Sequence, residues 1–284
     1  MRFKIPRTIN SLILSLLFTG TKAGMGQSTS KKLLPLFELG SGLIFTHFPD
    51  YPGSGHSRQY VLPFPVAIYR GRLLRSDQEG GVRGRLLQTQ YVESDMTYGG
   101  TVSAPGKQSP DRSGMPVLKN VGEAGPALVL KLYRSRDPRL DVVSSFRLAF
   151  STNFRMINYQ GNVYSTFLRL RFNDILPAGG TTHLRLGMKY ASQMLMRLYY
   201  EVSKPYITAE RPAFTAKPGL MYWNASFHSY LPVSNNFSLF SSLITFFTGQ
   251  SANRQSPLLT VDRNHVINFG FLYTFYRSRE KGWR

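Results

Sequence analysis

The stretch that decides the fold is the last regular one, which reads Asn268-Phe269-Gly270-Phe271-Leu272-Tyr273-Thr274-Phe275. Successive side chains of a β-strand point to opposite faces, so the aromatic residues here, at every second position, share one face. A strand with such a face would invite aggregation in water. The face suits lipid when the strand belongs to a closed barrel, because closure leaves no backbone group unpaired. The stretch therefore predicts a membrane-spanning β-barrel.

Alternation of the same kind recurs along the chain far more often than the helical period of about 3.6 residues. Apolar residues recur at every second position in the stretches 128–132, 146–150, 168–172, 184–190 and 223–227. Turn residues bound twelve predicted strands, or ten if the two shortest stretches are not strands. The twelve are 34–47, 60–70, 72–77, 81–88, 91–103, 121–134, 140–154, 162–173, 181–193, 219–231, 237–247 and 265–275.

Connections between these strands alternate between short and long. Turns such as Arg70-Gly71 and Thr89-Gln90 alternate with loops such as 48–59 and 194–218. Outer-membrane barrels have short turns at the periplasmic end and long loops outside, and both ends of the predicted barrel then fall on the periplasmic side. We therefore predict an all-β fold, a transmembrane antiparallel up-and-down β-barrel that occupies residues 34–275.

A soluble β-sandwich is the alternative that alternation alone leaves open. Such a fold buries its apolar face and presents its polar face to water. The polar face here carries Arg169, Arg171, Arg185 and Lys189, which a wide, wet barrel lumen accommodates easily. Aromatic residues also gather near the predicted strand ends, as in the girdles at a membrane interface. We therefore prefer the membrane barrel.

The first residues of the chain indicate export. Three basic residues within the first seven precede the apolar run 12–18, and small residues follow. This order is typical of a secretory signal peptide, and the run is too short to span a membrane as a helix. We predict a signal peptide at 1–23, a short N-terminal segment at 24–33 and a basic C-terminal tail at 276–284. The expected location is the bacterial outer membrane.

The composition argues against several classes of function. The net charge is +20, but the basic residues are dispersed and no nucleic-acid-binding motif accompanies them, so no nucleic-acid partner is expected. The lack of cysteine excludes disulfides, thiolate metal sites and cysteine nucleophiles. The sequence contains no phosphate-binding loop and no paired-histidine metal motif, so we predict neither a cofactor nor a metal site.

Catalysis is also not expected. An acyl hydrolase needs a serine, a histidine and an orienting polar group within hydrogen-bond reach. His228 and Ser229 are adjacent, so a strand points them to opposite faces. Ser226 shares the face of His228, but the sequence offers no evident third partner. The chain is therefore predicted to be non-enzymatic, with no catalytic residue.

The inward face of the predicted barrel holds the best candidate for a functional site. Basic and acidic residues on it either form a pathway that selects small solutes by charge, or pair with one another and fill the barrel. A twelve-stranded lumen lies between the packed eight-stranded and the open sixteen-stranded cases, so size leaves both readings open. The basic candidates are Lys131, Arg147, Arg169, Arg171, Arg185 and Lys189, and the acids are Glu38, Asp77, Glu93, Asp95 and Glu123.

The long loop 194–218 carries aromatic residues among charged ones. Such a mixture suits a recognition surface. The same loop would plug the barrel if it folded inward. Pro205 and Pro212 stiffen the loop in either case, so the sequence does not separate these readings.

The final strand resembles the C-terminal insertion signal of bacterial outer-membrane proteins, carried here by Asn268, Gly270, Tyr273 and Phe275. The resemblance implies that the barrel-insertion machinery recognises this strand. The chain continues past Phe275, so Trp283 in the tail is the alternative terminal aromatic residue.

Several segments, in order, resemble the MipA/OmpV family of outer-membrane proteins. The most specific is Tyr206-Ile207-Thr208-Ala209-Glu210-Arg211-Pro212-Ala213-Phe214, with Lys217 and Gly219 after it. The others are Phe48–Ser54, Val61–Pro65, Tyr69–Gly71, Gly81–Leu86, Gly114–Pro116, Gly122–Pro126 and Ser256–Leu258. The resemblance runs from about residue 36 to 275.

The family resemblance implies a non-enzymatic outer-membrane β-barrel that acts as a scaffold for murein (peptidoglycan) synthesising and degrading enzymes. The partners it implies are a lytic transglycosylase and a murein synthase, besides outer-membrane lipid, lipopolysaccharide and the barrel-insertion machinery. Other members are associated with adhesion or with passage of small solutes. A channel through a basic lumen and a surface adhesin are therefore the alternatives, because one fold hosts many functions.

Overall fold

The structure is a computed structural model that describes residues 34–71, 74–77, 81–84, 87–101, 109–134, 137–152, 156–176 and 179–282. The predicted signal peptide, the segment 24–33 and Trp283 lie outside the described residues. One antiparallel sheet contains 13 strand segments in the order β4-β3-β2-β1-β13-β12-β11-β10-β9-β8-β7-β6-β5. The segments are β1 (Phe37–Pro49), β2 (Ser57–Arg70), β3 (Leu74–Asp77), β4 (Gly81–Gly84), β5 (Leu87–Gln88), β6 (Val92–Thr101), β7 (Asn120–Arg134), β8 (Arg139–Thr152), β9 (Ile157–Leu176), β10 (Gly180–Ala191), β11 (Gly219–Pro232), β12 (Phe237–Phe247) and β13 (Arg263–Arg277).

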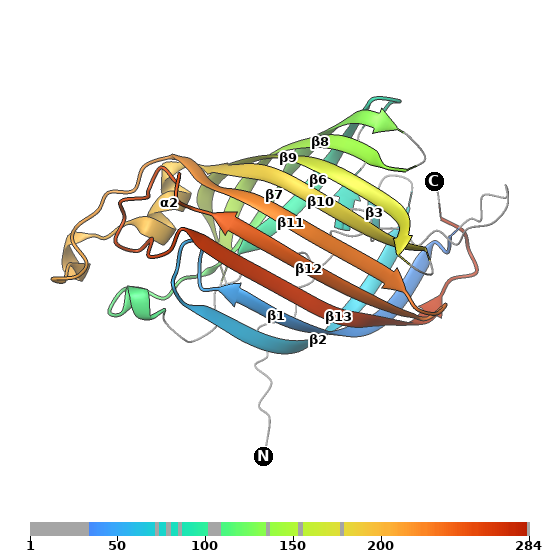
Figure 1. Cartoon of the computed structure of the whole chain (residues 1–284), viewed down its shortest axis with the longest axis horizontal. Helices are drawn as coiled ribbons and strands as arrows, with labels where there is room; N and C mark the ends of the chain where they lie inside the picture. Colours follow the sequence, from blue (N-terminus) through green and yellow to red (C-terminus); the bar gives the residue numbers. More distant parts are fainter. Residues whose placement is uncertain are drawn as a thin grey trace, which may run out of the picture.

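Two short segments bring the edges of the sheet together. β4 pairs with β3 at one edge, and β5 pairs with β6 at the other. Both belong to the stretch 81–88, which the sequence predicts as a single strand. The two edges therefore meet in one stretch of chain, and the sheet curls into the barrel of Figure 1. Residues 85 and 86, between β4 and β5, lie outside the described part of the chain.

The rest of the topology is the predicted up-and-down meander. Apart from the break between β4 and β5, each strand pairs with its neighbours in sequence, and β13 returns to pair antiparallel with β1. The all-β transmembrane barrel is thus confirmed. β9 is longer than predicted, since it begins at Ile157 and ends at Leu176. The predicted loop 194–218 contains a helix that the sequence analysis did not anticipate.

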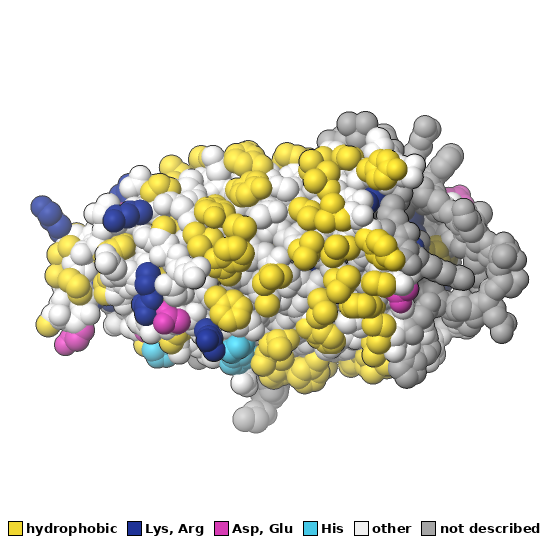
Figure 2. All heavy atoms as spheres, turned by 45° about the horizontal axis from the view of Figure 1, so that its top comes forward, with side chains coloured by type: hydrophobic (Ala, Val, Ile, Leu, Met, Phe, Trp, Pro, Cys, Tyr) yellow, Lys and Arg dark blue, Asp and Glu magenta, His cyan; other side chains and the backbone are white. Residues whose placement is uncertain are grey.

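The outer wall of the barrel is apolar. The aromatic residues at alternate positions of β13 are exposed, whereas Leu272 on its other face is buried. Phe269 stacks on Phe45 of β1 with ring centroids 4.8 Å apart, and Phe271 stacks on Phe237 of β12 at 5.4 Å. Figure 2 shows apolar side chains spread over the wall, and most visible charges near the end with the long loops. Such a wall is what contact with lipid requires.

The two ends of the barrel differ. One carries the helix α2 (Gln193–Tyr200) and two short 3-10 helices, η1 (Pro110–Arg112) and η3 (Lys204–Tyr206). The other carries short turns and the C-terminal residues (Figure 1). In outer-membrane barrels the long loops lie outside the cell and the short turns face the periplasm. No helix in the described part of the chain is long and apolar enough to cross a membrane.

The periplasmic rim joins the two ends of the described chain. β13 continues past Phe275 to Arg277, with a β-bulge in its pairing with β1. The bulge turns Arg277 inward, and its Nε atom lies 3.2 Å from the Glu38 carboxylate. Beyond the strand, residues 278–282 and 34–37 share main-chain hydrogen bonds. The C-terminal residues therefore extend the sheet at the rim.

Candidate functional site: the barrel lumen and its cap

One charged group of the lumen is centred on Glu123 of β7, which is buried. Lys189 Nζ of β10 lies 2.5 Å from one carboxylate oxygen, and Arg147 Nη2 of β8 lies 3.4 Å from the other. Phe146 and Leu148, which alternate with Arg147, are exposed on the outer wall, so Arg147 points inward. One carboxylate thus holds two cations inside the barrel, where an unpaired charge would be costly.

Two further pairs use the same inward faces. Asp141 of β8 accepts hydrogen bonds from Arg169 of β9, at 3.0 Å from Nε and 2.8 Å from Nη2. Lys131 Nζ of β7 lies 2.9 Å from the carboxylate of Glu93 on β6. At least four of the six basic lumen candidates are therefore paired with acids in the described part of the barrel. This arrangement favours an ion-paired network that fills the barrel over an open pathway.

Two of the remaining predicted acids, Glu38 and Asp95, are also buried. Glu38 accepts a hydrogen bond of 2.5 Å from Arg70 near the periplasmic rim, where Arg277 also reaches it. Asp95 is buried in β6. The side chain of Asp77 lies outside the described part of the structure.

The other two basic candidates, Arg171 of β9 and Arg185 of β10, flank a histidine. His183 lies opposite Arg171 in the β9–β10 ladder and opposite His228 in the β10–β11 ladder. The Arg185 guanidinium lies 5.3 Å from the ring centroid of Phe167. His183 itself is 1% exposed. Arg185 is two residues away in the sequence, but only the strand register places Arg171 opposite this histidine.

The lumen also has an apolar part, which the sequence analysis did not predict. Phe64 of β2 meets Phe240 of β12 edge to face, with ring centroids 6.0 Å apart. Gly42 and Gly270 make room for these rings, because a Cβ there would lie 2.6 Å from Phe64 and 2.7 Å from Phe240. Hydrophobic packing therefore occupies another part of the lumen. The buried members of the cluster are Ile44, Phe64, Val66, Ile68, Tyr230 and Leu272.

A cap, defined as residues 50–56, 109–119, 192–218 and 248–262, covers the outer mouth (Figure 1). Buried side chains from all four segments form one cluster with inward residues at the outer strand ends. Its cap members are Tyr51, Met115, Leu195, Met196, Tyr199, Tyr200, Val202, Ala216, Leu258 and Leu259, and its barrel members are Val121, Ala149, Val163, Ala191 and Met221. The loop that contains α2 is therefore a structural part of the cap.

Two buried tyrosines fasten the cap. The Tyr51 hydroxyl donates to the Leu258 carbonyl at 2.7 Å, and the Tyr200 hydroxyl donates to the Pro52 carbonyl at 2.8 Å. Ser256 Oγ donates in turn to the Tyr200 carbonyl at 2.7 Å. Burial raises the pKa of both phenols well above the ordinary value, so both remain neutral donors at physiological pH.

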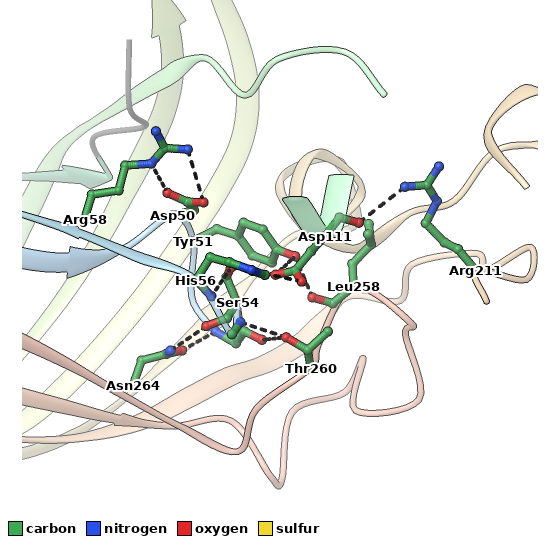
Figure 3. Close-up of polar contacts among 12 residues, drawn as sticks. Asp50, Tyr51, Ser54, His56, Arg58, Asp111, Arg211, Leu258, Thr260 and Asn264 are labelled. Atoms are coloured by element: carbon green, nitrogen blue, oxygen red, sulfur yellow. Dashed lines mark hydrogen bonds and ion pairs between the residues drawn. The ribbon is translucent and has the colours of Figure 1, made fainter. Parts of the chain in front are cut away.

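Asp111, in η1, links the first cap segment to the others (Figure 3). Its carboxylate accepts a 2.8 Å hydrogen bond from Ser54 Oγ and lies 3.2 Å from His56 Nδ1, and its carbonyl accepts from Arg211 at 3.3 Å. Serine, histidine and aspartate thus meet. However, the Ser54 hydroxyl donates to the aspartate, whereas a hydrolase triad needs it on the imidazole. The group therefore joins loops and does not activate a nucleophile.

A second serine–histidine pair, on β11, also lacks the arrangement of a hydrolase triad. His228 Nε2 lies 3.0 Å from Ser226 Oγ on β11. The residues opposite His228 in the two ladders are His183 and Ser242, so no carboxylate orients the ring from those positions. Within the described residues, no group of three or more histidine, aspartate or glutamate side chains could hold a metal ion.

The proposed insertion signal occupies both faces of β13. Tyr273 and Phe275 are exposed on the outer wall. Asn268 points inward and donates to Ser242 Oγ of β12 at 2.9 Å, and Gly270 lies against Phe240 as described above. The strand pairs with both β12 and β1.

Residues 41–275 match the family described as MltA-interacting protein MipA. The chain belongs to this family. The match begins within β1 and ends within β13, so the MipA-family region is the barrel itself. Together with the apolar outer wall, this makes the protein an outer-membrane β-barrel.

Solved structures give further likenesses to this MipA-family barrel. The COG4313 outer membrane channel from Pseudomonas putida F1 has 11% identity and a TM-score of 0.45, over 88% of this chain and 100% of that one. The NanC porin has 7% identity and a TM-score of 0.36, over 84% and 98%. At these values the likenesses carry no functional inference. No curated protein matches the chain.

Proposed function

We propose that this MipA-family protein is a non-enzymatic, closed barrel that acts as a scaffold for murein-synthesising and murein-degrading enzymes at the outer membrane. The observation that supports this function is the ion-paired and apolar interior beneath the cap. Four lumen cations pair with acids, an apolar cluster packs beside them, and a hydrophobic cap covers the outer mouth. An interior of this kind favours the docking of partners on the outer surfaces over a wide channel for solutes.

The family description, MltA-interacting protein, supports the choice of partner. We propose a lytic transglycosylase and a murein synthase, whose substrate lies on the periplasmic side. Contacts with outer-membrane lipid, lipopolysaccharide and the barrel-insertion machinery are part of the same proposal, because an outer-membrane location requires or favours them. The proposed function includes no nucleic-acid partner.

The docking surface is proposed to lie at the periplasmic rim. The turns there are short, but the paired segments 34–37 and 278–282 add to the surface. Arg279 and Lys281 are exposed on this segment, whereas Arg277 is held by Glu38. Two exposed basic side chains on an ordered backbone suit a partner with an acidic patch.

The test is a pull-down with the mature barrel immobilised in detergent and the purified lytic transglycosylase and murein synthase of the same bacterium. Wild type should retain both enzymes. Arg279→Glu with Lys281→Glu should reduce retention by about tenfold or more, because like charges would then face each other. Lys204→Glu with Lys217→Glu, a matched reversal on the exposed cap, should retain both. If wild type retains neither enzyme, the scaffold function is wrong.

A further inference from the structure

The side chain of His183, on the inward face of β10, is buried without a hydrogen bond to any described residue. It is 1% exposed, and neither ring nitrogen has a hydrogen-bond partner. The hydroxyl of Thr181, two residues earlier on the same face of β10, is also buried and without a partner. Buried side-chain nitrogens and oxygens are bonded in the large majority of cases, because leaving one unpaired is costly. Two such groups side by side mark a candidate binding site.

The groups around His183 define the charge of its ligand. Arg171 lies directly opposite on β9, and Arg185 lies two residues along β10 on the same face. Guanidinium groups carry donors only, and an imidazole offers at least one N–H. Arg169, opposite Arg185, is already bonded to Asp141. Donors and positive charge therefore converge, which is the complement of an anion.

The neighbours on the other side of His183 are occupied. His228 is bonded to Ser226 at 3.0 Å. In the same row across the strands, Asn268 of β13 donates a hydrogen bond to Ser242 of β12 at 2.9 Å. His183 thus lies at the border between a satisfied polar belt on β11–β13 and the arginines of β9 and β10.

We propose that the lumen binds a small oxyanion of the phosphate or carboxylate class between Arg171, Arg185 and His183, with the Thr181 hydroxyl as a further donor. The planar guanidinium of arginine can donate two parallel hydrogen bonds to two oxygens of either class of anion, whereas a halide ion is a single acceptor atom. The bound anion stabilises the folded barrel, since it binds the native state alone. The site is independent of the scaffold function.

The test uses the mature barrel refolded in detergent with ¹⁵N-labelled histidine. Inorganic phosphate, and separately acetate, replaces chloride at constant ionic strength and pH, and the imidazole signals are followed. We expect a saturable shift of the His183 signal, assigned with His183→Gln. Arg171→Gln with Arg185→Gln should weaken binding by about tenfold or more. Lys204→Gln with Lys217→Gln, which removes two charges from the cap, should leave it unchanged.

The outcomes separate clearly. A shift with phosphate alone, or with acetate alone, identifies the class of anion. No saturable shift with either would overturn the proposal, and so would equal affinity in the Arg171/Arg185 double variant. If that variant does not refold, Arg185→Lys keeps the charge but removes the fork. It should weaken binding of the effective anion severalfold, and unchanged affinity would contradict the site.

Discussion

At the scale of the residue, Glu123 organises the charged part of the lumen. It forms ion pairs with both Lys189 and Arg147, which come from different strands. Gly99 of β6 permits this arrangement, because a Cβ there would lie 2.7 Å from Arg147 Nη1. A buried pair gains little over apolar packing, but removal of one partner leaves a charge without compensation. Loss of the Glu123 carboxylate therefore leaves Lys189 and Arg147 without this acid inside the barrel.

Glu123→Gln should therefore destabilise the folded barrel by about 3–5 kcal/mol. The measurement is urea unfolding in detergent, followed by tryptophan fluorescence. Glu210→Gln, at an exposed cap position, is the matched control and should change the free energy of unfolding by no more than about 0.5 kcal/mol. Adding Lys189→Met to Glu123→Gln should recover part of the loss. Equal free energies of unfolding for Glu123→Gln and the control would show that the ion pairs of Glu123 do not stabilise the folded barrel.

At the scale of the element, β13 combines two roles. Its outer face is aromatic and its inner face contacts β12 through Asn268. The bulge near Phe275 leaves both Phe275 and Tyr276 exposed, and lets Arg277 reach Glu38. The last aromatic residue of the regular pattern therefore lies at the point where the strand changes register, close to the periplasmic rim.

Phe275→Ser should reduce assembly into the outer membrane severalfold, if the insertion machinery recognises the end of β13. The measurement is the amount of heat-modifiable protein in the outer-membrane fraction. Phe227→Ser is the matched control, because Phe227 is also exposed on the barrel wall but lies within β11. Normal assembly of Phe275→Ser would point to Trp283 as the recognised terminus.

The strands were predictable because alternation and turn residues are local signals. What the sequence could not give depends on contacts between distant residues. Alternation does not show that the inner face of β2 is also apolar, since Val61 is exposed while Phe64 packs inside. Helix α2 was missed because its apolar face packs on other loops. The partner of Lys189 depends on which acid the folded barrel brings against it, as does the position of His183 beside Arg171.

At the scale of the whole molecule, the barrel interior holds two layers of side chains, one in the cap and one on the inward faces of the strands. The cap covers the outer mouth with a hydrophobic cluster, and ion pairs and apolar side chains project into the lumen below it. The two layers share the outer strand ends, where Val121 and Met221 belong to the same cluster as the cap. Loss of one layer leaves the other in place, because the lumen pairs use strand residues alone.

The refolded mature barrel should therefore give no conductance steps in a planar bilayer. A variant with residues 203–217 replaced by a short glycine–serine linker should also be silent, because the lumen pairs remain. A heat-dependent shift on a gel must show that both proteins are folded, so that silence reports a closed lumen. Steps in the linker variant alone would make the cap the barrier. Stable, charge-selective steps in wild type would mean that the side chains filling the lumen leave a pathway for ions, and would favour a channel over a scaffold.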